Sequence, residues 1–280
     1  MNYIKRFRVE TGSKVDLGKV DAGFKDQHES REQALPEIEA CDQKLHDLQY
    51  LMYAEGRRSL LICLQGRDAA GKDGTINHVL GAMNPQGCTV TGFKVPSKEE
   101  AAHDFLWRYH QAAPRTGQVA IFNRSHYEDV LVVRVHDLVP EKVWSKRYEH
   151  INNFEKLLHD NGTHILKFYL HIDQGEQLQR FKQRIDDPAR HWKISEGDYA
   201  ERPFWDAYTD AFEAALGKCS SAHAPWFVIP SNHKWFRNLA VSRIVVETLE
   251  QLDMKFPAPT VDMDEIRKKY HQAAQVAAGK

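Results

Sequence analysis

The sequence lacks the features that mark several large classes of protein. None of its apolar runs approaches the ~20 residues that a membrane-spanning helix requires. Lysine and arginine (38) balance aspartate and glutamate (39), so the chain has no basic excess of the kind that general nucleic-acid binders show. The patterns H-E-x-x-H and C-x-x-C do not occur, so the histidines and cysteines give little support for a zinc site.

Cysteine is scarce, with four residues at positions 41, 63, 88 and 219. Their number and spacing do not suggest a disulfide framework, and the polar residues after Met1 do not resemble a secretory leader. We therefore expect reduced thiols and a cytoplasmic protein without membrane or nucleic-acid partners.

Short apolar runs alternate with helical patterns along most of the chain. Five runs predict buried strands, at 59–65, 88–95, 118–124, 164–172 and 225–230. Helices are expected at 36–56, from Lys72, from Ser97, and at 141–160, 175–187 and 232–252. This alternation predicts an α/β fold with a five-stranded parallel sheet covered by helices on both faces.

The polar segment 1–32 is interpreted as an N-terminal arm lying on the body. Residues 33–256 are expected to form one domain, and 257–280 a helical tail. Lys5, Arg6 and Arg8 give the arm a basic character, so a role of the arm in binding an anionic substrate stays open.

The stretch "GRDAAGKDG" (66–74) nearly matches the phosphate loop G-x-x-x-x-G-K-[ST]. It follows an apolar strand and precedes a helix, which is the context that this motif requires. Glycines allow the backbone N–H groups to turn inward as an anion nest, and the positive end of the following helix adds to it. Lys72 would supply a cation for the distal phosphates.

Two carboxylates in the loop depart from this motif. Asp73 stands where Ser or Thr is usual, and Asp68 lies within the loop itself. A carboxylate would repel phosphate unless a cation lies between them, and Mg²⁺ favours one or two carboxylates together with phosphate oxygens. We therefore predict that Asp68 holds Mg²⁺. For Asp73, a metal ligand and a helix cap are equally reasonable.

The strand "QVAIFNRS" ends in Asn123, Arg124 and Ser125, which are expected to reach the same edge of the sheet as the glycine loop. Asn123 offers a neutral oxygen to a metal, or is only a turn residue. Arg124 has the planar fork suited to phosphate, or forms an ion pair with Glu128 or Asp129.

The segment 180–195 holds five basic residues against two acidic ones, Asp186 and Asp187, and Pro188 interrupts its helix. This composition predicts a lid that closes over an anionic substrate, although an ordinary solvated helix face would look similar.

Three blocks in this order resemble the polyphosphate kinase 2 family: "GRDAAGKDG", "PRTGQVAIFNRSHYEDVLVVRVH" (114–136) and "RFKQRIDDPARHWKISEGD" (180–198). The resemblance covers about residues 30–255. Many members have Asp-Arg-Ser in the second block where this chain has Asn-Arg-Ser, which is similar to the class III subgroup. The resemblance implies a three-layer P-loop kinase fold with a helical lid at about 180–198.

The resemblance and the loop motif together predict roles for particular residues. The catalytic set is expected to be Asp68, Lys72, Asn123, Arg124 and Arg184. The acceptor nucleotide is expected near Arg124, Glu128 and Asp129, and Mg²⁺ (or Mn²⁺) near Asp68, Asn123 and Asp73. Lys94 is added to the acceptor set because it follows the second predicted strand, although a surface lysine is equally reasonable there. Phosphate binding is assigned to Gly66, Arg67, Ala69, Ala70, Gly71, Lys72, Asp73, Gly74, Thr75, Arg190 and Lys193.

The implied activity is transfer of phosphoryl groups from inorganic polyphosphate to AMP and ADP, without a covalent enzyme intermediate, by a homodimer or homotetramer. The main alternative is an ATP-dependent nucleoside-monophosphate kinase of the thymidylate-kinase type, which shares the fold, loop and lid. A nucleotide-binding switch is a second alternative, but such proteins usually hold magnesium through Ser or Thr, and Asp73 argues against it.

Overall fold

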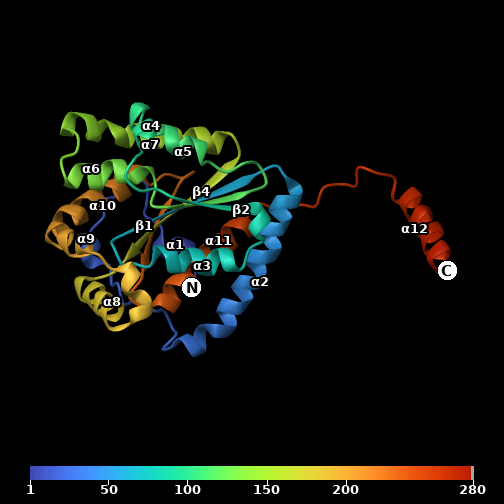
Figure 1. The fold of residues 1–280 in the computed structure, drawn as a ribbon, viewed down its shortest axis with the longest axis horizontal. Helices are drawn as coiled ribbons and strands as arrows, with labels where there is room; N and C mark the ends of the chain where they lie inside the picture. Colours follow the sequence, from blue (N-terminus) through green and yellow to red (C-terminus); the bar gives the residue numbers. More distant parts are fainter. Residues whose placement is uncertain (279–280) are drawn as a thin grey trace.

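A computed structural model describes residues 1–278. The centre of the structure is a five-stranded parallel sheet in the order β2-β3-β1-β4-β5. Figure 1 shows this sheet surrounded by helices. The strands are β1 Ser59–Gly66, β2 Cys88–Gly92, β3 Val119–Asn123, β4 Thr163–His171 and β5 Trp226–Pro230. All five strands predicted from the sequence are therefore confirmed, each within about one residue at most ends, although β2 stops at Gly92 rather than continuing to 95.

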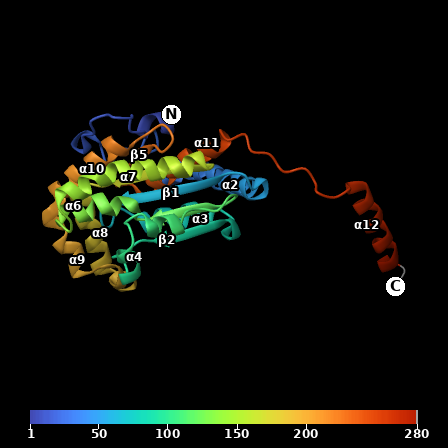
Figure 2. The same cartoon turned by 90° about the horizontal axis from the view of Figure 1, so that it is seen from above.

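Helices cover both faces of the sheet (Figure 2). The longer ones are α2 Arg31–Glu55, α3 Lys72–Gly81, α7 Glu141–Asp160, α8 Gln174–Asp186, α10 Trp205–Cys219, α11 Lys234–Glu250 and α12 Met263–Ala278. The short ones are α1 Tyr3–Phe7, α4 Lys98–Ala102, α5 Trp107–Gln111, α6 Val132–Val135 and α9 Glu196–Ala200. Single 3-10 turns are η1 Leu17–Lys19, η2 Pro85–Gly87, η3 His126–Val130, η4 Pro188–Lys193 and η5 Arg202–Phe204.

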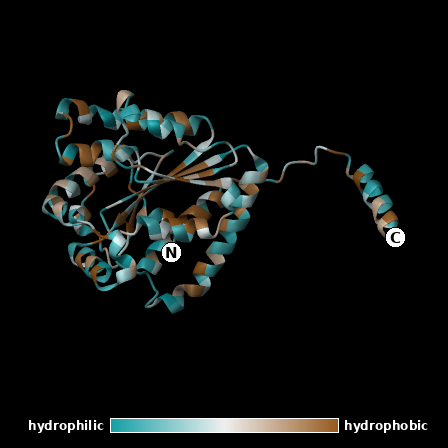
Figure 3. Cartoon of the chain, in the orientation of Figure 1, coloured by the Kyte–Doolittle hydropathy of each residue, from teal (hydrophilic) through white to brown (hydrophobic). Residues whose placement is uncertain are grey.

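Alternate residues of each strand face opposite layers, as the period of a β-strand requires. In β1, Leu60, Ile62 and Leu64 pack with α2, α3 and α11. Leu61 and Cys63 pack on the other side, in a cluster that includes residues of α5 and α7. The strands are correspondingly apolar and the outer helix faces polar (Figure 3). A sheet buried on both faces explains why the strands appear in the sequence as continuous apolar runs.

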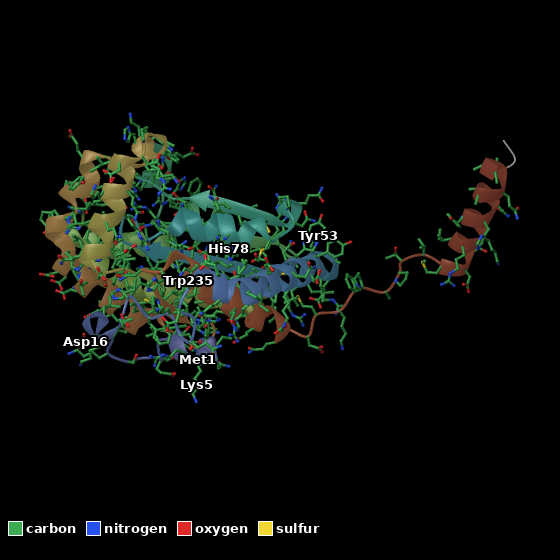
Figure 4. The ribbon with its side chains drawn as sticks, turned by 90° about the horizontal axis from the view of Figure 1, so that it is seen from below. Met1, Lys5, Asp16, Tyr53, His78 and Trp235 are labelled. Carbon is green, nitrogen blue, oxygen red and sulfur yellow. The ribbon has the colours of Figure 1, made fainter. Side chains whose placement is uncertain are left out.

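The arm is fixed to the body by two aromatic side chains. Tyr3 and Phe7 are buried and lie against Phe236 of α11. Lys5 extends outward (Figure 4), and Arg8 donates to the carbonyl oxygens of Ser221 and Ala222.

The tail helix α12 lies away from the body, and none of its residues is buried (Figure 1). No helix in residues 1–278 is both long and apolar enough to cross a bilayer. The division into arm, domain and tail stays a prediction.

Candidate active site

The loop between β1 and α3 has the backbone of an anion nest. Gly71 has φ 105° and Ala69 has φ 64°, so the chain curls tightly before α3 begins at Lys72. The ammonium Nζ of Lys72 donates to the carbonyl oxygens of Gly66 (2.6 Å) and Arg67 (3.3 Å). Burial, with a further contribution from Arg124, lowers the pKa of Lys72 to about 8. The loop therefore holds a cation whose charge is only partly compensated.

Both loop carboxylates contact residues at the end of β3. Arg124 donates from Nη2 to Oδ1 of Asp68 (3.1 Å) and from Nη1 to Oε2 of Glu128 (3.4 Å). Asn123 donates from Nδ2 to Oδ1 of Asp73 (2.8 Å). The parallel pairing of β1 with β3 produces these contacts, because it brings the carboxyl ends of both strands to one edge. The conformation of Arg124, with φ 63°, is uncommon for a side-chain-bearing residue and directs its guanidinium to this edge.

A cavity of about 450 Å³ extends from the loop to the predicted lid. Its charged lining consists of Lys72, Lys94, Arg124, Arg180, Arg184, Arg190, Lys193, Lys234 and Arg237, with Asp68, Asp73 and Asp198. Nine basic residues thus face three acidic ones in a chain whose net charge is -1. We call this cavity the cationic cleft.

A second cavity, of about 50 Å³, lies on the other side of Asp68 and Arg124. It has aromatic side chains from α10, namely Trp205, Tyr208 and Phe212, together with the carboxylates of Glu128 and Glu201. We call it the aromatic cavity. Its volume corresponds to a few water molecules, so a larger group enters only if the residues around it move.

Arg180 connects helix α8, the start of the predicted lid, to the loop. Its guanidinium donates to the carbonyl oxygens of Ala69 (2.7 Å) and Ala70 (3.0 Å), and also to those of Ser231 and Asn232 after β5. The Glu176 carboxylate one turn earlier accepts from its Nε (2.6 Å). Sequence analysis counted Arg180 only as part of a basic segment. The spacing of four residues between Glu176 and Arg180 predicts their ion pair from the sequence. The contact of Arg180 with a loop more than 100 residues away cannot be predicted from the sequence pattern.

Three residues predicted in segment 180–198 line the cationic cleft: Arg184, predicted as catalytic, and Arg190 and Lys193, predicted to bind phosphate. Arg184 donates to the carbonyl oxygen of Lys193 (2.8 Å) and lies 3.6 Å from Oδ1 of Asp198, which holds α8 against η4 and α9. Arg190 pairs with Asp187 at 2.8 Å. Arg237 and Lys234 of α11 also line the cleft and were not predicted from the sequence.

Asp129, Thr75 and Arg67 do not line the cationic cleft, although the sequence predicts them in the acceptor and phosphate sites. Asp129 is buried and lines neither of these cavities: its carboxylate accepts from Arg147 (2.8 Å) and from the Tyr109 hydroxyl (3.2 Å), which indicates a structural role. Thr75 is buried, and its hydroxyl donates to the Gly71 carbonyl oxygen (3.2 Å).

Arg67 turns away from the nest and lies over the Trp205 ring, 3.7 Å from its centroid. It also donates to Oγ1 of Thr209. The two remaining acceptor candidates are divided, since Lys94 faces the cationic cleft and Glu128 the aromatic cavity.

The predicted metal ligands suit Mg²⁺ chemically. Asp68 and Asp73 supply two carboxylates and Asn123 an amide oxygen, all lining the cationic cleft. In the described part of the chain no group of three or more His, Cys, Asp or Glu residues is arranged to hold a metal ion. Two carboxylates and one amide oxygen are the donor set of an ion that takes few protein ligands and completes its shell with substrate oxygens and water.

Comparison with known proteins identifies the family of the chain. Residues 27–257 match the family model for polyphosphate kinase 2. The chain belongs to the polyphosphate kinase 2 family. It is similar to the AMP/ADP-polyphosphate phosphotransferase of Meiothermus ruber, with 48% identity over 94% of this chain and 99% of that protein.

Two further relatives cover nearly the whole chain. The ADP-polyphosphate phosphotransferase of Rhodopseudomonas palustris is 46% identical over 91% of this chain and 93% of its own length. The crystal structure of polyphosphate kinase 2 from Arthrobacter aurescens matches with a TM-score of 0.94 at 39% identity, covering 97% of each chain. The predicted fold, a P-loop kinase-type α/β sheet, is thereby confirmed.

Proposed function

We propose that this enzyme transfers phosphoryl groups from inorganic polyphosphate to AMP and ADP, giving ADP and ATP, in a Mg²⁺-dependent in-line reaction. The observation that carries the proposal is the cationic cleft, in which nine basic side chains face three carboxylates beside the phosphate loop. Such an excess suits a donor that is a long polyanion more than one that carries a single triphosphate.

The two cavities suggest where donor and acceptor bind. The cationic cleft would hold polyphosphate, and the aromatic cavity would receive the nucleoside of the acceptor after Trp205 and Tyr208 move aside. Asp68 and Arg124 line both cavities, so the transferred group would pass between substrates at these two residues. In this arrangement Glu128 lies on the acceptor side.

Phosphoryl transfer depends mainly on alignment and charge neutralisation. An acceptor phosphate with a second pKa of about 6 is largely deprotonated at neutral pH, so no strong general base is needed. Lys72, Arg124 and Arg184 would stabilise charge on the transferred group, and the Arg124 contact fixes the orientation of Asp68. Bound Mg²⁺, held by Asp68 with Asn123 and Asp73, would neutralise phosphate charge and orient the substrates.

The deciding experiment mixes the enzyme with AMP, polyphosphate and Mg²⁺ without any nucleoside triphosphate. We expect ADP and then ATP to appear, and both to vanish when a chelator removes the metal. ADP formed only when ATP replaces polyphosphate would instead identify an ATP-dependent nucleoside-monophosphate kinase. A parallel reaction with ADP as the only acceptor tests the second step separately.

A homodimer or homotetramer acting in the cytoplasm completes the proposal. All four cysteines are free, which is compatible with a reducing compartment. Size-exclusion chromatography with light scattering tests the oligomeric state, and a monomer at micromolar concentration would contradict it.

A further inference from the structure

Arg237, on α11, carries a buried guanidinium at the wall of the cationic cleft. Only 3% of the residue is exposed. Its Nε and Nη2 donate to Oδ1 of Asn238 (3.1 and 2.8 Å), and its Nη1 makes a long contact with the Ala70 carbonyl oxygen (3.4 Å). All of these acceptors are neutral, and the side chain also lines the cationic cleft.

Within residues 1–278, no carboxylate oxygen lies within 4.0 Å of this guanidinium. Its charged neighbour is Arg180, whose own charge is compensated by Glu176 at 2.6 Å. Burial, with the nearby Arg180, lowers the pKa of Arg237 to about 9. A buried charge without a counter-ion is costly, and proteins rarely keep one unless a ligand completes the pair.

The start of α3 is shaped around this side chain. A Cβ atom added to Gly71 would lie 1.8 Å from Nη1 of Arg237, and one added to Gly74 would lie 3.0 Å from Nη2. Gly71 is the second glycine of the phosphate loop motif, and Gly74 follows the motif in the first turn of α3. Because these glycines have no side chain, the guanidinium can pack against the backbone beside the N-terminus of α3. The N–H groups at a helix N-terminus favour an anion.

Lys234 stands three residues earlier on the same helix and also lines the cleft. Its Nζ donates to Oε1 of Gln183 (3.2 Å), and no carboxylate in the described chain pairs with it. Positions i and i+3 share a helix face, so the two cations project to the same region.

We propose that Arg237 and Lys234 form an anion subsite for one phosphate group of the polyphosphate chain, next to the phosphates held by the glycine loop. This inference rests on the proposed function and adds α11 to the donor site. The Arg237 fork supplies paired N–H donors to phosphate oxygens, and Lys234 adds a second charge. The bound phosphate then provides the counter-ion that the free protein lacks.

The test compares Arg237→Met and Arg237→Lys with wild type. Thermal melting is measured with and without long-chain polyphosphate, with no nucleotide present. In Arg237→Met we expect polyphosphate affinity on the order of 10-fold to 100-fold weaker, the usual effect of losing a charge-assisted hydrogen bond. The melting temperature without ligand should be unchanged or higher, because a buried unpaired charge has been removed. Arg237→Lys should retain part of the affinity.

Arg243→Met is the matched control on the same helix. Arg243 pairs with Glu37 and Glu247, so its loss should lower the melting temperature and leave polyphosphate affinity unchanged. If wild type is active and Arg237→Met binds polyphosphate as tightly as wild type, the subsite is overturned and the proposed function is not. Lack of polyphosphate binding and turnover by wild type would overturn the proposed function and the subsite together. In Arg237→Met, a higher KM for polyphosphate with an unchanged KM for AMP would support the subsite and the proposed function.

Discussion

Lys167→Met is expected to destabilise the protein strongly, because Lys167 is the cation of a fully buried network behind the active site. Its Nζ donates to Oε2 of Glu155 (2.6 Å), the Tyr127 hydroxyl (2.8 Å) and the Cys219 carbonyl oxygen (2.6 Å). Oε1 of Glu155 accepts from Tyr127 (2.8 Å) and His126 (2.9 Å). Lys167 and Glu155 have side chains that are 0% and 1% exposed.

The magnitude follows from what the substitution leaves behind. Burial alone would raise the pKa of Glu155, but Lys167 and His126 hold that pKa below its usual value, so the carboxylate is ionised. Removing Lys167 leaves this charge buried without its cation, at a cost of about 3–5 kcal/mol. The network also fixes His126 and Tyr127, which follow Arg124 by two and three residues, so loosening it would disturb the orientation of Arg124.

Urea unfolding at pH 7 measures the change in free energy of unfolding. Lys156→Met is the control, since the Lys156–Asp160 pair on α7 is 60% and 51% exposed and should contribute less than about 1 kcal/mol. In Lys167→Met, burial would raise the pKa of Glu155 above its unfolded-state value. Protonation then relieves the buried charge, so the loss relative to wild type should shrink as pH falls.

The double variant Lys167→Met/Glu155→Leu separates charge burial from packing. It should recover much of the lost stability, because no uncompensated charge remains. If Lys167→Met unfolded at the same urea concentration as Lys156→Met, the reasoning about this buried network would be refuted.

Three further predictions concern the active site. Asp68→Asn should keep the fold, measured by circular dichroism, and reduce kcat on the order of 100-fold; wild-type activity would contradict the metal assignment. Lys72 is protonated below about pH 8, so kcat/KM for polyphosphate should fall as pH rises through that value, and a flat profile would exclude its charge from binding. Trp205→Ala should raise the KM for AMP and leave the KM for polyphosphate unchanged; the reverse pattern would place the nucleoside elsewhere.

Local patterns in the sequence were sufficient to predict the elements that carry the site. The helix predicted from Ser97 is present as α4, which begins with a capping box formed by Ser97 and Glu100, and α7 spans the predicted residues 141–160. The helix predicted from Pro36 begins earlier, at Arg31, so Pro36 lies inside the helix, where its ring nitrogen cannot donate to the carbonyl oxygen of Glu32. The strand–loop–helix context of "GRDAAGKDG" placed the phosphate loop, because neighbouring residues determine its backbone.

The tertiary structure decided which side chains surround that loop. Asp129 and Glu128 are adjacent in sequence, yet one is paired in the interior with Arg147 and the other lines a cavity, since a single residue step turns the side chain to another side. Arg180 and Arg237 contact the loop only because β4 pairs with β1 and β5 with β4, which brings α8 and α11 beside the loop. The sequence by itself determined the chemistry and local geometry of the phosphate loop. The counter-charges around it depend on contacts between distant segments, and these form only when the sheet assembles.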